Sequence, residues 1–270
     1  VIASPAAHEG VLVAGTIDNS LHGIDIDTGD ERWSIATDGS IFGSPVVVDG
    51  TVFVGDVGGT IYALDPGTGE ERWSTGIDNA VVTRPALTDD TLIVGGLGVG
   101  DPMDQSDTGP FATSQNYLYA IDRLNGGIRW THEIRGFVTD PTILDGAVCV
   151  GTRHGAIRTV DIDTGSTSWE LSLEAELAGS PAVDGDALIW GARDGTVYRI
   201  SPAADGVDWT FETEGAILAG PAIQGSTGVI TSEFDGIYRF ETRTGEVLQR
   251  VALADQHRSV PAFTGRGFVV

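Results

Sequence analysis

One short motif recurs along the chain and constrains its fold more than any other feature. In the clearest copy, Asp65 is followed by Gly69 four residues later and by Trp73 four residues after that. The complete copies are Asp25, Gly29 and Trp33; Asp65, Gly69 and Trp73; Asp122, Gly126 and Trp130; and Asp161, Gly165 and Trp169. Two later copies are degraded: Ser201, Gly206 and Trp209 in one, and Glu241, Gly245 and Gln249 in the other.

The residue types in this motif indicate a structural role. The aspartate can accept hydrogen bonds from N–H groups of the turn it opens, and the glycine supplies a positive φ. The tryptophan buries roughly 200 Å², worth up to about 5 kcal/mol. A ring of that size, recurring once per repeat, is predicted to pack against the neighbouring repeat. We therefore expect the motif residues, Trp209 included, to be docking positions, and we assign no catalytic residue.

Prolines mark the same period independently. They are Pro5, Pro45, Pro85, Pro141, Pro181, Pro221 and Pro261, at spacings of 40, 40, 56, 40, 40 and 40 residues. Periods near forty residues indicate stacked repeats or a propeller.

One repeat illustrates the predicted local structure. Its four expected strands are Pro45–Val48, Thr51–Val54, Thr60–Leu64 and Glu71–Thr75, and they are separated by glycine-containing turns. Such a pattern predicts a four-stranded antiparallel meander, the blade of an all-β propeller. We predict one propeller domain over residues 1–270, with six complete repeats and a seventh that stops after two strands. Since ring closure removes sheet edges, we expect the chain to be a fragment of a protein with seven or eight blades.

The pattern Ala-x-Asp-x-x-x-Gly-x-x-x-Trp at residues 63–73 resembles the tryptophan-docking motif of the pyrroloquinoline quinone (PQQ)-like repeat β-propellers. That family includes quinoprotein alcohol dehydrogenases and a non-enzymatic outer-membrane assembly lipoprotein. The resemblance covers nearly the whole chain, and it is specific for the fold but weak for the activity. It implies a location outside the cytoplasm or at the cell surface.

The features that the dehydrogenases would bring are not placed on any residue of this sequence, and their adjacent cysteines are absent. In those enzymes PQQ is held with calcium, a catalytic aspartate and a disulfide between adjacent cysteines, whereas Cys149 is the only cysteine of this chain. An apolar run surrounds Cys149, which predicts a buried small residue. We therefore expect a non-enzymatic scaffold that binds a protein or a small ligand. The alternatives are a PQQ-dependent dehydrogenase or its remnant, and the sensor propeller of a membrane-anchored receptor or kinase.

Two groups of charged residues are candidate sites. Asp101, Asp104 and Asp107 lie in an insertion at residues 98–115, which is either a tolerated surface loop or a calcium site. Arg84 and Asp140 each precede a repeating proline. By the resemblance, these two lie close to a central channel, as an ion pair between blades or as part of a ligand site.

The charge balance limits the classes of partner. The chain has 39 acidic residues against 15 basic ones, all arginine, for a net charge of −24. Repulsion among so many carboxylates is screened at molar salt, so we predict that the protein comes from a halophile. The alternative interpretation of the acidity is a basic partner or a calcium-loading surface. No cluster of basic residues supports nucleic-acid binding. The sequence contains no run of eighteen apolar residues, so it predicts no membrane-spanning segment.

Overall fold

A computed structural model describes residues 3–98, 115–136, 139–152, 155–253, 260–264 and 267–269. Residues 99–114 of the predicted insertion therefore lie outside the described part. The chain forms two compact units by its contacts: Val1–Pro141 with Ile162–Ser166, and Thr142–Asp161 with Thr167–Val270.

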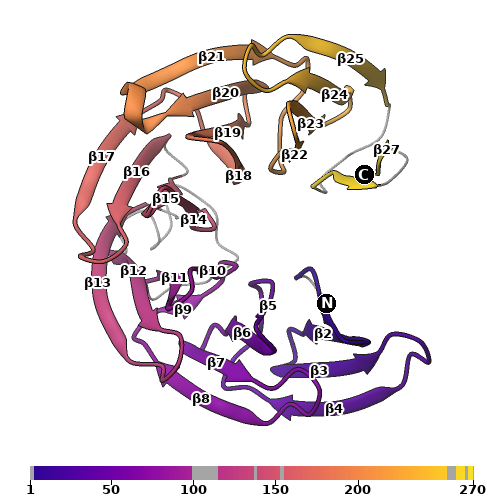
Figure 1. Cartoon of the computed structure of the whole chain (residues 1–270), viewed down its shortest axis with the longest axis vertical. Helices are drawn as coiled ribbons and strands as arrows, with labels where there is room; N and C mark the ends of the chain where they lie inside the picture. The colour runs from indigo at the N-terminus through magenta and orange to yellow at the C-terminus, as the bar shows by residue number, and fades with distance from the viewer. Residues whose placement is uncertain are drawn as a thin grey trace. The chain divides into compact units, whose positions relative to one another are not determined.

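Unit 1 contains three antiparallel sheets whose strands pair in chain order (Figure 1). The first sheet is β1 (Ala6–His8), β2 (Val11–Gly15), β3 (Ser20–Asp25) and β4 (Glu31–Ala36). The second sheet is β5 (Val46–Val48), β6 (Thr51–Gly55), β7 (Thr60–Leu64) and β8 (Glu71–Gly76). The third sheet is β10 (Ala86–Leu87), β11 (Thr91–Leu97), β12 (Gln115–Asp122) and β13 (Ile128–Arg135), and the short β9 (Ala80–Val81) also pairs with β11.

Unit 2 contains the fourth, fifth and sixth sheets and a strand pair. The fourth sheet is β14 (Thr142–Leu144), β15 (Ala147–Gly151), β16 (Ala156–Asp161) and β17 (Thr167–Ser172). The fifth sheet is β18 (Leu177–Asp184), β19 (Ala187–Ala192), β20 (Thr196–Ser201) and β21 (Gly206–Glu212), with the 3₁₀ helix η2 (Pro202–Ala204) before β21. The sixth sheet is β22 (Ala222–Gln224), β23 (Thr227–Ser232), β24 (Gly236–Glu241) and β25 (Val247–Ala252), and β26 (Ala262–Thr264) pairs with β27 (Gly267–Val269). The predicted all-β fold of four-stranded antiparallel sheets is confirmed.

The repeating prolines stand where first strands begin. In five of the six four-stranded repeats, and in the β26–β27 pair, the first strand starts one residue after its proline. Pro181 instead lies inside β18, where the pairing register shifts between Ala178 and Ala182. A proline is tolerated at such an irregular place because its missing N–H is not needed by the ladder.

A register shift recurs between the third and fourth strands of every four-stranded repeat. It falls between Gly23 and Ile24 in the first sheet, and at the equivalent residues of the other five. The extra residue places Trp33 opposite Gly23 in the ladder. The bulge thus fixes the register from which each motif tryptophan projects.

Side chains from consecutive sheets interdigitate to form the cores. Between the first two sheets, Val13, Leu21 and Trp33 pack with Val54 and Tyr62 in one buried cluster. The whole of β6 is buried, as is the whole of β11. These second strands are covered on both faces, which explains their nearly continuous apolar sequence.

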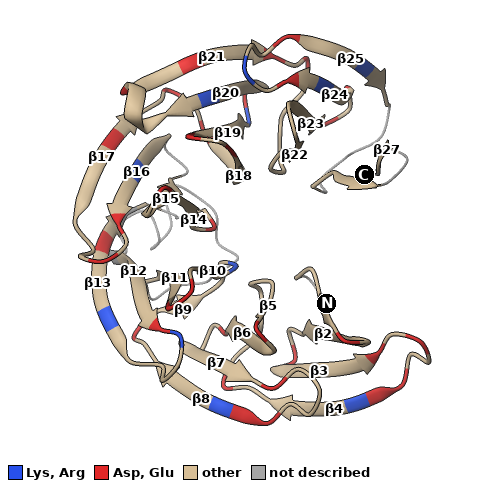
Figure 2. Cartoon of the chain, viewed as in Figure 1, with Lys and Arg blue, Asp and Glu red and all other residues tan. Residues whose placement is uncertain are grey.

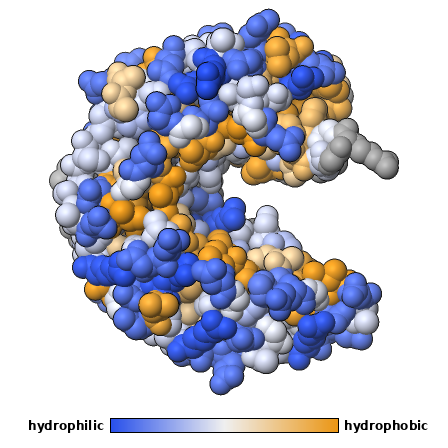
Figure 3. Space-filling view, viewed as in Figure 1, coloured by the Kyte–Doolittle hydropathy of each residue, from blue (hydrophilic) through white to orange (hydrophobic). Residues whose placement is uncertain are grey.

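The surface combines acidic turns with arginines on strands. Figure 2 shows a basic segment beside an acidic one on β4 and on β8, and one of each, farther apart, on β13. On the face that Figure 3 shows, hydrophobic side chains form separate groups among hydrophilic ones.

A buried carboxylate holds the segment between the first two sheets in place. Asp56 is completely buried. It accepts hydrogen bonds from the N–H groups of Gly39 and Thr60, both at 2.9 Å, and from the Tyr62 hydroxyl at 3.0 Å. Burial raises the pKa of Tyr62 to about 12, so this hydroxyl keeps its proton and donates it.

Replacing Asp56 by alanine is predicted to lower the free energy of unfolding by about 3 kcal/mol or more, because buried donors lose their acceptor. Asp27→Ala is the control, since the Asp27 side chain is exposed, and its effect should stay within about 0.5 kcal/mol. The measurement is urea denaturation at molar salt, followed by circular dichroism. Equal effects of the two variants would contradict the proposed role of Asp56.

Candidate functional site

Four motif tryptophans make the same contact with the next copy of the motif. Each indole N–H donates to the backbone carbonyl of the residue that follows the next acidic motif position. The pairs are Trp33 with Pro66 at 2.9 Å, Trp73 with Arg123 at 3.0 Å, Trp130 with Ile162 at 2.7 Å and Trp209 with Thr242 at 3.0 Å. Each tryptophan therefore meets a turn that comes roughly one repeat later in the chain.

The motif glycine is required by that contact as well as by its own backbone. Gly69 has φ +73°, and a Cβ added there would lie 2.6 Å from Cε3 of Trp33. The same crowding, at 2.8 Å or less, holds at Gly126, Gly165 and Gly245. A side chain at this position cannot coexist with the indole in its present place. The sequence pattern indicated the positive φ but not the crossing of the tryptophan onto the glycine.

The motif aspartates hold their own turns. Oδ1 of Asp25 accepts from the N–H groups of Asp27 and Thr28, both at 2.9 Å, and Oδ2 accepts from Arg32 at 2.5 Å. The hydrogen bond from Arg32 and those from the turn hold the pKa of Asp25 at about 2, below its ordinary value of 3.8. The equivalent ion pairs are Asp65 with Arg72 at 3.2 Å and Asp122 with Arg129 at 2.8 Å.

The fourth and fifth sheets depart from this pattern. Asp161 ends β16, but Ser168 stands where the first three copies have the arginine. In the next copy Ser201 replaces the aspartate, and Asp208 stands at the arginine position. Arg199 now supplies the positive charge, with an ion pair to Asp208 and a 3.4 Å contact to Asp184.

A second departure changes the position of a tryptophan. Asp205 occupies the place of the motif glycine, with φ +61°. Because its Cβ takes the space that an indole fills elsewhere, Trp169 does not make the usual contact with Pro202. Its N–H donates instead to Oδ1 of Asp205 at 2.7 Å. Gly206, which the sequence showed one place late, begins β21.

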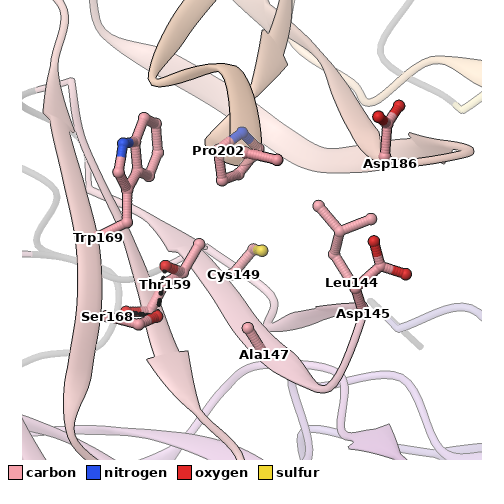
Figure 4. A pocket seen from close by; sticks show the side chains of 10 residues that line it. Leu144, Asp145, Ala147, Cys149, Thr159, Ser168, Trp169, Asp186 and Pro202 are labelled. Carbon is pink, nitrogen blue, oxygen red and sulfur yellow. Dashed lines mark hydrogen bonds between the residues drawn. The ribbon is translucent and has the colours of Figure 1, made fainter.

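A cavity of about 280 Å³ lies at this irregular junction within unit 2. Trp169 and Thr159 contribute to its lining from the fourth sheet, and Pro202 and Ala203 from the turn before β21. Figure 4 shows Asp145 and Asp186 on the side opposite Trp169, with Cys149 between them. The Thr159 hydroxyl is 2.8 Å from that of Ser168.

Cys149 contributes to the cavity because it is small. It lies opposite Thr159 in the ladder, at the register position that Phe53 has opposite Ala63 in the second sheet. There the Phe53 ring contacts Trp73, with centroids 5.9 Å apart. Cys149 is fully buried, as predicted, and burial raises the pKa of its thiol to about 12. A thiol that stays protonated at neutral pH is a poor nucleophile, so this residue is not suited to covalent catalysis.

The predicted pair of Arg84 and Asp140 meets through the backbone of one partner. The N–H of Arg84 donates to Oδ1 of Asp140 at 2.9 Å, and the arginine residue is exposed. The residues two repeats earlier behave alike, since the N–H of Ser4 donates to Oγ of Ser44 at 3.0 Å. This hydrogen bond does not require arginine at position 84. The ion pair and the ligand site both stay predictions.

The pair of Arg84 and Asp140 does not by itself fit a calcium site. One arginine and one carboxylate at positions 84 and 140 fall short of the six to eight oxygen ligands that calcium takes. Within the described ranges, no three or more His, Cys, Asp or Glu residues are grouped so as to hold a metal ion. Asp101, Asp104 and Asp107 lie outside these ranges, so the calcium prediction for them is untested. In the same described part, no helix is long and apolar enough to cross a membrane.

Comparison with known proteins identifies related sequences and folds. Residues 1–99, 95–193 and 193–270 match the family described as outer membrane protein assembly factor BamB. No curated protein matches the chain. The structure is similar to that of BamB from Moraxella catarrhalis, with 19% identity, a TM-score of 0.72, and coverage of 92% of this chain and 72% of that one.

It is also similar to the quinohemoprotein alcohol dehydrogenase from Comamonas testosteroni. That match has 15% identity, a TM-score of 0.73, and coverage of 95% of this chain. The chain spans 60% of the length of that dehydrogenase. At such identities the two matches show the propeller fold that the motif predicted, and no more.

Gly69→Ala is predicted to destabilise the protein more than Gly29→Ala. The two glycines have similar φ, +73° and +78°, but a Cβ at position 29 would meet nothing within 4 Å. Both variants carry the backbone cost of about 1–2 kcal/mol, and only Gly69→Ala adds about 1–3 kcal/mol of overpacking against Trp33. Urea denaturation of both variants measures the difference. Equal losses would mean that the indole contact is not tight.

The contribution of the Asp25 carboxylate is predicted to depend on pH. Its folded pKa is lowered to about 2, so the stabilisation is present above the unfolded value of 3.8 and is lost as the pH falls towards 2. Asp25→Asn should therefore lower the melting temperature at about pH 7, and the difference from wild type should shrink below about pH 4. Calorimetric melting curves across this range test it. A difference that stays constant with pH would show that the charge of Asp25 is not involved.

Proposed function

Because this chain belongs to the β-propeller family of the outer membrane protein assembly factor BamB, we propose that it is a non-enzymatic scaffold outside the cytoplasm that binds a protein partner. The repeated side chains support this proposal by their positions. The indole N–H groups of four motif tryptophans and the carboxylates of Asp25, Asp65 and Asp122 bind turns of the protein itself. The side chains that remain to bind a partner are those of the turns whose sequences differ between repeats.

The observation that carries the proposal is an exposed aromatic residue in a rigid turn. Phe234, between β23 and β24, is 60% exposed and has φ +58°. A bulky residue in this conformation is strained, and such strain persists only where the surroundings impose it. Exposed aromatic residues held in place are typical anchors of protein interfaces.

A network around the buried carboxylate of Asp235, the residue next to Phe234, imposes this conformation. Asp235 accepts hydrogen bonds from the Tyr238 hydroxyl at 2.5 Å and from the N–H of Glu214 at 2.9 Å, and it pairs with Arg250. Burial opposes ionisation of Asp235, but these donors and the arginine hold its pKa below the ordinary value. Arg250 also bonds Glu214 at 2.9 Å and lies over the Tyr238 ring. The turn is thus fixed before any partner arrives, which reduces the entropy lost on binding.

The test is recovery of a partner from membrane extracts of the source organism by the tagged protein. Phe234→Ala should reduce recovery at least about tenfold. Leu124→Ala is the control, because Leu124 is 81% exposed in a turn of unit 1, and it should leave recovery unchanged. Melting curves show whether both variants are folded. Equal recovery by wild type and Phe234→Ala would overturn the assignment of this turn.

Two other results would reject the scaffold proposal itself. Calcium-dependent binding of PQQ at micromolar concentrations, measured by calorimetry, would favour a dehydrogenase. A kinase or membrane-spanning segment in the same polypeptide would favour a sensor. In line with the net charge of −24, we propose that the protein works at molar salt, and the binding experiments belong in that range.

A further inference from the structure

The cavity beside Trp169 contains a carboxylate whose counterpart elsewhere in the chain is paired. Asp49, in the turn between β5 and β6, accepts from Arg123 at 2.6 Å. Arg123 also donates to the carbonyl of Thr88 at 3.2 Å, and it comes from the motif turn of the next repeat. A guanidinium thus lies between two repeats at this place in unit 1.

Asp145 occupies the same turn position two repeats later, and no residue that the structure describes supplies it with such a cation. Its φ of +49° matches the +48° of Asp49. The residue equivalent to Arg123 in the following repeat is Pro202, which has no charge. Among the described residues, no hydrogen bond or ion pair is made by the Asp145 carboxylate.

The space behind Asp145 is apolar and ready to receive a ligand. About 280 Å³ is unfilled beside Trp169, whose indole bonds Asp205, and the small side chain of Cys149. Leu144 and Pro202 add further apolar surface to the lining. This volume lies at the lower end for ligand sites, which suits a molecule of roughly ten non-hydrogen atoms.

The remaining polar groups of the lining define the charge of the ligand. Asp186 adds a second carboxylate, which is 3.7 Å from the guanidinium of Arg199 and is partly neutralised by it. The two carboxylates disfavour an anion and favour a cation.

We propose that this cavity binds a small organic cation with an apolar body, an arylalkyl ammonium or guanidinium. The charged group lies at Asp145, in the position that Arg123 takes beside Asp49. The apolar body lies between Trp169 and Pro202, above Cys149, where it is removed from water and contacts the indole. The residues of this site lie apart from Phe234 in the sequence, and the proposal of a ligand here does not depend on the proposed scaffold function.

The test measures binding of 2-phenylethylammonium and of benzylguanidinium by calorimetry and by quenching of tryptophan fluorescence. Neutral 2-phenylethanol is the matched probe without charge. Both cations should bind saturably at one site, and the alcohol at least about tenfold more weakly, because only a cation pairs with Asp145. The same affinity for the alcohol, or no saturable binding of the cations at millimolar concentration, would overturn the proposal.

Two aspartate variants separate this site from general attraction to an acidic protein. Asp145→Asn should weaken binding of the cations at least about tenfold. Asp49→Asn changes the net charge equally, in the equivalent turn already paired with Arg123, and should leave the affinity unchanged. Equal weakening by both variants would show that the cations bind only through the overall charge.

Two further variants fill the site from within the chain. Cys149→Phe introduces the residue found at position 53 and should abolish binding by filling the cavity. Pro202→Arg supplies the guanidinium that Arg123 provides in the third repeat, and it should block Asp145 without altering the core. Circular dichroism establishes that each variant is folded. A folded Pro202→Arg protein that binds the cations as the wild type does would contradict the site.

Discussion

The contact between an indole ring and a glycine of the next repeat is the constraint on which the rest of the structure depends. A four-stranded sheet cannot bury the tryptophan of its fourth strand on its own, because it covers only one side of the ring, as Gly23 does for Trp33. It needs a turn without a side chain to lie against, and the next repeat supplies one, as Gly69 does for Trp33. The carboxylate that opens that turn and the arginine that binds it hold the glycine in place. The hydrogen bonds within each turn therefore determine how the tryptophan of the preceding repeat packs.

Much of this could be predicted from the sequence, because the interactions repeat. The spacing of prolines and the alternation of apolar runs with glycine turns predicted the four strands of the second sheet within one residue at each end. Repetition also showed that the copies around Ser201 and Glu241 are degraded. A periodic signal reports what every repeat shares, and the shared part of this chain is its fold.

The candidate sites were harder to predict because they arise where repetition fails. In the sequence, the only sign of Asp205 is that the motif glycine comes one residue late. The effect of Asp205 is on the hydrogen bond of Trp169, which lies 36 residues earlier. Asp235 and Asp56 both accept hydrogen bonds in the turn between the second and third strands of their sheets. They lie at different positions of that turn, so an alignment of the repeats does not place one opposite the other. No sequence pattern singled out Phe234, because it stands out by its positive φ and its exposed side chain, and both are known only from the folded chain. Arg84 and Asp140 were found near each other, although their hydrogen bond uses a main-chain group that every residue type but proline offers.

The contact between repeats also has a direction. Each sheet presents a tryptophan on one side and a glycine turn on the other, so two sheets join head to tail and never through like surfaces. A head-to-tail contact has no intrinsic end, since every repeat added offers the same acceptor to the one before it and the same ring to the one after. Genes that encode such repeats can gain or lose one copy of about forty residues by recombination without creating a new kind of interface. The copy number of repeats is then free to vary in evolution, and a copy that drifts, as the fifth has around Asp205, can acquire a cavity while its neighbours maintain the fold.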